Sequence, residues 1–418
     1  MLPAHRDMAG LSFATGDMSF SQPSSRRLVQ VAGGAALLLG LAAAASAFSQ
    51  DAASSRLGLA LAFGGIFGIV LQRSRFCFLC HTRDLVEQGD PRGVLSILVA
   101  LAVGIAGYAL IMSQWLPIPA PDRLPPTAHI GPVSPVLAGA AFVFGLGMAI
   151  SGACISAHLY RLGEGSPTAP FALVGTLMGF AIGFATWNGL YLGVVSEASV
   201  LWLPHSFGYG GAMLLGFAVL AALGVVTLLA AGASEKPEAP PLTLRNLLAA
   251  IFFKRWPASV GGAAVGVIST AYYLRIAPLG VTAELGSIAR MTASHIGLAP
   301  ETLVGLDRFR GCATAAKALL ISDNGVFVAG LVLASFASAL IAGQFTPRRP
   351  DWSDVGRGLL GGALMGWGAM TALGCTVGVL LSGIHTGAVS GWVFLAACFA
   401  GVLTGLWLRR LAARRSEA

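Results

Sequence analysis

The sequence predicts an all-α polytopic membrane protein with about 9–10 transmembrane helices, additional re-entrant half-helices and two inverted-topology halves. Hydrophobic residues make up 56% of the 418 residues and charged residues only 11%, whereas soluble domains carry about 25% charged residues. The 55 glycines are interleaved with apolar residues, as in helices that approach one another closely inside a bilayer. We therefore expect the chain to lie in a lipid bilayer.

A window of about 19 residues identifies the apolar stretches that are candidates for spanning helices. They lie near 28–48, 56–72, 93–114, 133–153, 170–192, 207–231, 260–276, 325–343, 356–374 and 388–408. The stretches 56–72 and 260–276 are short and rich in glycine, so one of them is expected to be a half-membrane helix. Because Arg26 and Arg27 precede the first stretch and Ala45-Ser46-Ala47 ends it, a cleaved secretory signal is an alternative there.

The net charge of +8 comes mostly from Lys and Arg between alternate apolar stretches. This distribution predicts that both termini are cytoplasmic. No basic stripe is interleaved with aromatic residues, so no nucleic-acid partner is expected. The proline-rich stretch near 232–246 predicts a linker. The expected organisation is an N-terminal cytoplasmic extension (1–27), a first membrane half (28–231), the linker (232–259), a second membrane half (260–408) and a basic tail (409–418).

Two glycine-rich segments, 145–154 and 366–375, resemble each other and suggest an internal repeat. Aligning Cys154 with Cys375 also aligns Gly147 with Gly368, and a short polar stretch follows each cysteine. In the predicted topology the two segments run in opposite directions across the membrane. Transporters built from inverted repeats bind their substrates where discontinuous helices meet near the midplane. The repeat therefore predicts that Cys154 and Cys375 lie on a transport path.

A second signal is the pair Cys77-x2-Cys80, which follows the short stretch 56–72. Such a pair is typical of redox sites or of metal sites. No second Cys-x2-Cys or His-x3-His accompanies it, so no metal is expected. Cys398, inside the last apolar stretch, and Cys312 are expected to be ordinary buried residues.

The run Arg73-Ser-Arg-Phe-Cys77-Phe resembles the signature of the YeeE/YedE family of bacterial sulphur-transport inner-membrane proteins. The segments 160–165, after Cys154, and 374–378, around Cys375, are similar to the same family. The resemblance implies an hourglass of helices that imports thiosulfate or a related sulphur anion past Cys77, Cys154 and Cys375. A cytoplasmic sulfur-carrier protein is a candidate partner. The chain departs from the family at features that include Cys80, Ala157-His158, Cys312, the segment 307–317 and the extension 1–27.

Neutral thiols suit such a path because an S–H group is a weak donor for a soft sulphur acceptor. An apolar setting keeps the thiol protonated, and weak contacts let an ion leave each site as readily as it enters. Residues around the three cysteines are expected to support the path through helix breaks, polar groups or charge. These are Arg75, Gly152, His158, Arg161, Glu164, Gly374, Gly378, Ser382 and Gly383. Arg161 and Glu164 are expected to form an ion pair.

The favoured function is therefore a transporter or channel for thiosulfate or a related anion, without enzymatic activity or a cofactor. The chain has no nucleotide-binding Gly-x4-Gly-Lys-Ser/Thr motif. One alternative is a membrane thiol enzyme that relays sulfur or electrons covalently between cysteines. Another is a soft-metal transporter, which the lack of clustered methionines disfavours.

Overall fold

The computed structural model consists of helices joined by loops, and within its described residues only isolated β-bridges occur. It describes residues 25–51, 54–120, 123–231, 250, 252–300, 302–306 and 322–416. Most of the predicted extension and linker, together with Cys312, therefore lies outside the described residues.

The first part of the described chain contains both long and short helices. They are α1 (Ser25–Gln50), α2 (Ser55–Ser74), α3 (Phe78–Gln88), α4 (Arg92–Trp115), α5 (Pro135–Ser151), α6 (Ile155–Gly163), α7 (Ala169–Gly193), the 3-10 helix η1 (Val195–Glu197) and α8 (Leu203–Leu229). The second part has a similar alternation. It contains α10 (Ala258–Arg275), α11 (Ala283–His295), α12 (Asp323–Ile341), α13 (Trp352–Thr371), the π-helix η3 (Thr376–Ser382), α14 (Gly383–His385) and α15 (Val389–Ser416).

Eight helical segments of the described chain are long and apolar enough to cross a membrane, or nine if α13 and the η3–α14 segment are counted as one bent span. This confirms the predicted all-α polytopic class. The short, glycine-rich stretch 56–72 lies in α2, which together with α3 forms one of the eight segments. The short, glycine-rich stretch 260–276 corresponds to α10, which is not one of the eight. Re-entrant helices and inverted halves stay predictions.

The long helices pack through glycines, as the composition predicts. A side chain at Gly366 of α13 would meet the backbone of α7, and one at Gly179 of α7 would meet the backbone of α13. The same holds for Gly64 and Gly68 of α2 against α12. Small residues allow backbones to approach within van der Waals contact, which provides the attraction between helices in a bilayer.

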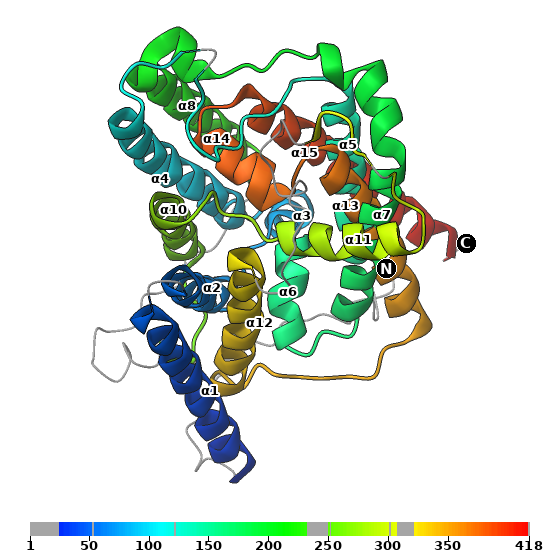
Figure 1. The fold of residues 1–418 in the computed structure, drawn as a ribbon. Helices are drawn as coiled ribbons and strands as arrows, with labels where there is room; N and C mark the ends of the chain where they lie inside the picture. The colour runs from blue at the N-terminus through cyan, green and yellow to red at the C-terminus, as the bar shows by residue number, and fades with distance from the viewer. Residues whose placement is uncertain are drawn as a thin grey trace.

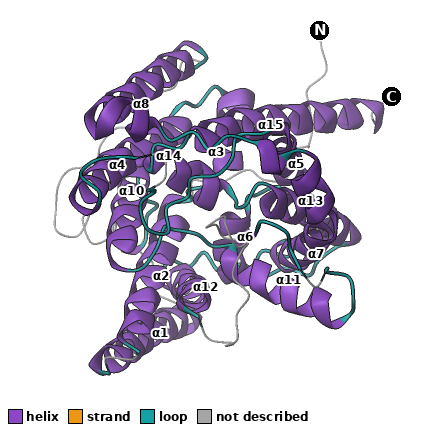
Figure 2. Ribbon diagram, turned by 45° about the horizontal axis from the view of Figure 1, so that its top comes forward, coloured by secondary structure: helices purple, strands orange, loops and turns teal. Residues whose placement is uncertain are grey.

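The long helices from the first part of the chain pack on long helices from the second part. Helix α2 packs on α12 and α10 packs on α4, while α5 packs on α15 and α13 packs on α7. In Figures 1 and 2 the short helices α3 and α6 lie in the middle of the molecule, and α1 and α8 lie at its periphery. The long helices therefore surround α3 and α6, which begin directly after Cys77 and Cys154.

Candidate functional site

Cys77 lies at a break between two helices. Helix α2 ends at Ser74, and Arg75 adopts a left-handed conformation with a φ of 52°. The chain then becomes extended, and Cys77 is the N-terminal cap residue of α3. Its side chain is fully buried. Because the first N–H groups of a helix lack partners within it, this cysteine sits where an electropositive helix end begins.

Cys154 occupies an equivalent position at a second break. Helix α5 ends at Ser151, and Gly152 takes a left-handed φ of 87°, a conformation that glycine adopts without steric cost. Cys154 then caps α6, and its fully buried sulfur lies 3.2 Å from the hydroxyl of Ser156. The glycine-rich sequence before the cysteine thus produces the break that was predicted from it.

The two breaks meet in the folded chain. The sulfur of Cys77 lies 3.9 Å from the sulfur of Cys154, although 77 residues separate them in sequence. Two helix N-termini, those of α3 and α6, therefore point at one pair of thiols. Each terminus resembles about half a positive charge, so the pair lies in an environment that favours a negatively charged ligand.

Cys80 and Arg161 extend this pair into a cluster. One guanidinium nitrogen of Arg161 donates to the sulfur of Cys80 at 3.1 Å, and another donates to the carbonyl of Gly152 at 3.3 Å. The predicted ion pair between Arg161 and Glu164 is wrong, because the guanidinium of Arg161 is directed to Cys80 of α3 and to Gly152 instead. Glu164 instead accepts from the side-chain amide of Gln72 at 3.2 Å.

Cys375 lies at a third break and belongs to the same buried core as the other two thiols. Helix α13 ends at Thr371, and Leu373 adopts a left-handed φ of 63°. Cys375 caps the π-helix η3 and is 1% exposed. Helix α13 and the following segment are bent by 44°. Within the described residues, no hydrogen bond joins Cys375 to Cys77 or Cys154. π-Helical segments are rare and frequently occur at functional sites.

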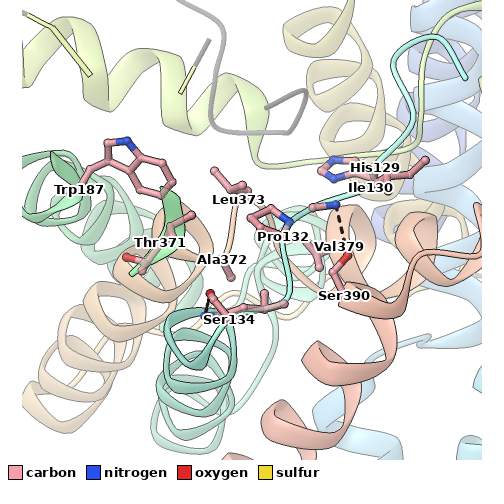
Figure 3. Close-up of a pocket in the computed structure, with 13 residues that line it drawn as sticks. His129, Ile130, Pro132, Ser134, Trp187, Thr371, Ala372, Leu373, Val379 and Ser390 are labelled. Atoms are coloured by element: carbon pink, nitrogen blue, oxygen red, sulfur yellow. Dashed lines mark hydrogen bonds between the residues drawn. The ribbon is translucent and has the colours of Figure 1, made fainter. Parts of the chain in front are cut away.

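A pocket opens beside the break that carries Cys375 (Figure 3). Leu373 and Val379, which precede and follow this cysteine, contribute to the lining. The loop 116–134 between α4 and α5 contributes His129 and its neighbours, and Ser390 of α15 completes the polar part. The pocket therefore lies next to the break that precedes η3, although Cys375 itself is not among its lining residues.

The side chain of His129 is buried in this loop, outside the spanning helices. Burial lowers the pKa of His129 to about 4, because an apolar environment disfavours the charged imidazolium. The ring is therefore neutral at physiological pH. The loop is fixed to the neighbouring helix by the N–H of Gly131, which donates to the hydroxyl of Ser390 at 3.3 Å.

The remaining predicted residues surround the breaks in different ways. The hydroxyl of Ser382 donates to the carbonyl of Leu279 at 2.9 Å and so fixes the end of η3. Gly378 lies inside η3, and Gly383 packs against Gly391. His158 is buried in α6, and neither of its ring nitrogens has a hydrogen-bond partner in the described part of the chain.

Two features of the site were missed by sequence reasoning. Cys80 was not assigned to the path, although its spacing of three residues from Cys77 places both on one face of a helix. His129 lies in a loop without a recognisable motif, and nothing local identified it. No group of three His, Cys, Asp or Glu residues suited to a metal forms among the described residues.

Comparisons with known proteins identify related chains. Residues 73–404 match the model of a family described as sulphur transport. The thiosulfate transporter TsuA of Spirochaeta thermophila is 29% identical over 359 residues, which cover 83% of this chain and 97% of that protein. The thiosulfate transporter TsuA of Escherichia coli is 28% identical over 378 residues, 82% of this chain and 92% of that protein. The probable transporter YedE of Escherichia coli matches 40% of this chain and 39% of its own length at 26% identity. The predicted resemblance is confirmed, as is the prediction of a transport protein and not an enzyme.

Proposed function

Because the chain belongs to the sulphur transport family, we propose that it carries thiosulfate or a closely related sulphur oxyanion across the inner membrane of a bacterium. The names of the two long relatives support thiosulfate as the substrate. The observation that carries the proposal is the pair of buried thiols, Cys77 and Cys154, whose sulfurs lie 3.9 Å apart at two helix N-termini.

This arrangement suits a dianion with a soft terminal sulfur. A bare charge in the centre of a bilayer costs at least about 3 kcal/mol on insertion scales, and the N-termini of α3 and α6 offset part of this cost. The thiols of Cys77 and Cys154 add weak S–H donors for the terminal sulfur. Weak contacts allow the anion to move on, as conduction requires.

The third thiol extends the path in the proposal. Cys375 caps a third broken helix. The pocket beside this break is lined mainly by apolar side chains, with His129, Ser134, Thr371 and Ser390 as its polar groups. The anion would pass between this pocket and the pair formed by Cys77 and Cys154 through an hourglass-shaped path. Gly152 and Gly374 would contribute by breaking the helices before the cysteines, since glycine allows backbone N–H groups to face the path.

The orientation of the chain is part of the proposal. The distribution of Lys and Arg favours cytoplasmic termini, and the linker before α10 then lies on the cytoplasmic side. A sulfur-carrier protein that receives the imported anion would dock at that face. The supporting argument is chemical, because a reactive sulphur compound is best handed directly to the protein that consumes it.

Uptake of labelled thiosulfate into proteoliposomes that contain the purified protein tests the proposal. We expect uptake that excess unlabelled thiosulfate abolishes and that sulfate reduces much less, because sulfate lacks the soft terminal sulfur. Sulfite and selenite as competitors define the range of substrates. Absence of uptake above that of empty liposomes, or equal competition by sulfate, would contradict the proposal.

The same assay separates passive transport from the covalent alternative. The contact of Arg161 with Cys80 at 3.1 Å is the observation that favours a reactive thiol. If a thiolate attacked thiosulfate, the S–S bond of thiosulfate would break, and a cysteine persulfide and sulfite would form. Mass spectrometry of the protein during uptake would detect the persulfide. We expect intact thiosulfate inside the vesicles and unmodified cysteines.

A further inference from the structure

The chain immediately before α10 lies on the break that follows α2. The N–H of Trp256 donates to the carbonyl of Arg73 at 3.0 Å. In return, one guanidinium nitrogen of Arg73 donates to the carbonyl of Lys254. The end of the predicted linker is therefore attached to Arg73 near the end of α2, four residues before Cys77.

Arg73 is buried in a way that a membrane anchor is not. A positive-inside arginine normally extends its charged end into water or among lipid head groups. Arg73 is only 1% exposed, and its Nε and Nη1 atoms have no hydrogen-bond partner among the described residues. An uncompensated buried charge is unfavourable, so an anionic ligand at these two nitrogens would stabilise the guanidinium.

The charges around Arg73 are mostly of the same sign. Arg255, on the linker segment, interacts electrostatically with Arg75 and Arg73 and with the carboxylate of Glu164. Burial, with a smaller contribution from Arg75, lowers the pKa of Arg255 to about 10. Glu164 is hydrogen-bonded to Gln72 and provides one negative charge against three positive charges.

This cluster lies next to the thiols. Glu164 caps the C-terminal end of α6, whose N-terminal end is capped by Cys154. Its hydrogen bond to Gln72 joins the end of α6 to the end of α2. Arg161, one turn before Glu164, donates to the sulfur of Cys80. The arginines of the linker segment and of the α2 break thus lie beside the helix that leads to the pair of thiols.

We propose that Arg73, Arg75 and Arg255, here named the arginine mouth, form a binding site for a small, doubly charged tetrahedral oxyanion. The inference rests on the proposed function in one respect, since the transported anion is one source of this ligand. The phosphate head group of a lipid is the other source and shares the same chemistry. Guanidinium groups bind the negatively charged oxygens that sulfate and thiosulfate share, so the site accepts both anions. The thiols, which contact the terminal sulfur of thiosulfate, distinguish it from sulfate.

Binding to the purified full-length protein in a neutral detergent tests the site. Sodium sulfate and sodium thiosulfate are titrated by isothermal calorimetry at constant ionic strength, with chloride as the reference anion. We expect both dianions to bind with dissociation constants within about threefold of each other. Arg255→Gln should weaken both at least tenfold, because a charge-assisted hydrogen bond is lost.

The matched control is Arg275→Gln. Arg275 is an exposed arginine at the last turn of α10 and lies outside the arginine mouth. Its replacement changes the net charge equally and should leave binding unchanged. Arg73→Gln should weaken binding more strongly than Arg255→Gln, and Arg255→Lys, which keeps the charge, should retain most of it. If Arg73→Gln does not fold, the variants of Arg255, which is only partly buried, alone decide the outcome.

Two results would overturn the site: no binding of either dianion to protein without bound phospholipid, or an equal loss in Arg275→Gln. Phosphorus analysis distinguishes the two sources of ligand. If the protein retains a phospholipid that Arg255→Gln releases, and delipidated protein then binds sulfate, the site stands with a lipid as its resident ligand. If no phospholipid is retained and sulfate binds, the site stands with the free anion as its ligand.

Sulfate binding also separates this inference from the transport proposal. Cys154→Ala should lose thiosulfate uptake but bind sulfate normally, since it leaves the arginine mouth intact. Wild-type protein that binds sulfate without transporting thiosulfate would contradict only the transport proposal. Protein that transports thiosulfate without any sulfate binding would contradict only the arginine mouth.

Discussion

Replacement of Cys154 by alanine is the sharpest test of the proposed path. The change removes a single fully buried sulfur, which lies 3.9 Å from the sulfur of Cys77 and 3.2 Å from the hydroxyl of Ser156. The break in the chain is preserved, because Gly152 and not the cysteine adopts the left-handed conformation. The variant therefore removes a donor from the path without moving the helices that form it.

The expected magnitudes for stability and transport differ. Losing one sulfur from a packed site should lower the free energy of unfolding by about 1 kcal/mol. A hydrogen bond to a charged ligand contributes about 1.5–3 kcal/mol, and the weak S–H donor of a thiol belongs at the lower end of this range. Since about 1.4 kcal/mol corresponds to a tenfold change, uptake at low thiosulfate concentrations should fall by roughly tenfold. Transport should thus suffer far more than folding.

Initial rates of labelled thiosulfate uptake and thermal unfolding in detergent measure the two effects. Cys398→Ala is the matched control, because Cys398 is also buried but lies within α15 and not at a helix break. It should lose similar stability and retain most of its uptake. Normal uptake by Cys154→Ala, or an equal loss in both variants, would refute the assignment of Cys154 to the path.

Three further predictions concern the thiol pair, the helix packing and the pocket. A diazene oxidant such as diamide should form a disulfide between Cys77 and Cys154, because their sulfurs lie 3.9 Å apart and need only a small movement to reach the S–S bond length of about 2 Å. Uptake should stop after oxidation and return on reduction, and peptide mapping should detect the disulfide. In Cys77→Ser the oxidant should change neither the peptide map nor the uptake. Gly366→Leu should lower the free energy of unfolding by about 1–3 kcal/mol, because the new side chain would meet the backbone of α7. The control is Gly189→Leu, at a position where an added Cβ has no neighbour within 4 Å. This change should alter the free energy of unfolding by less than about 0.5 kcal/mol, and thermal unfolding compares the two variants. Burial lowers the pKa of His129 to about 4, so the unfolded chain binds a proton at this imidazole more readily than the folded chain does. The contribution of His129 to the free energy of unfolding should be fully present above about pH 6.5 and decrease toward pH 4. Thermal unfolding scans at several pH values should show a weaker pH dependence for His129→Gln.

The sequence alone predicted the membrane class and the helix breaks at the cysteines. Hydropathy acts locally, because each apolar stretch must satisfy its backbone hydrogen bonds as a helix in lipid. Glycine also acts locally, as the left-handed Gly152 shows. For this reason the positions of Cys77, Cys154 and Cys375 at the ends of long helices were visible in the residue pattern.

Only the tertiary structure decided which of these sites meet. Cys77 and Cys154 come together because α3 and α6 lie in the middle of the bundle, and no local pattern specifies that contact. The prediction of an ion pair from the spacing of Arg161 and Glu164 was wrong for the same reason, since the guanidinium of Arg161 donates to the sulfur of Cys80 on another helix. Local sequence fixes where a chain bends, but the packing of distant helices fixes what each bend faces.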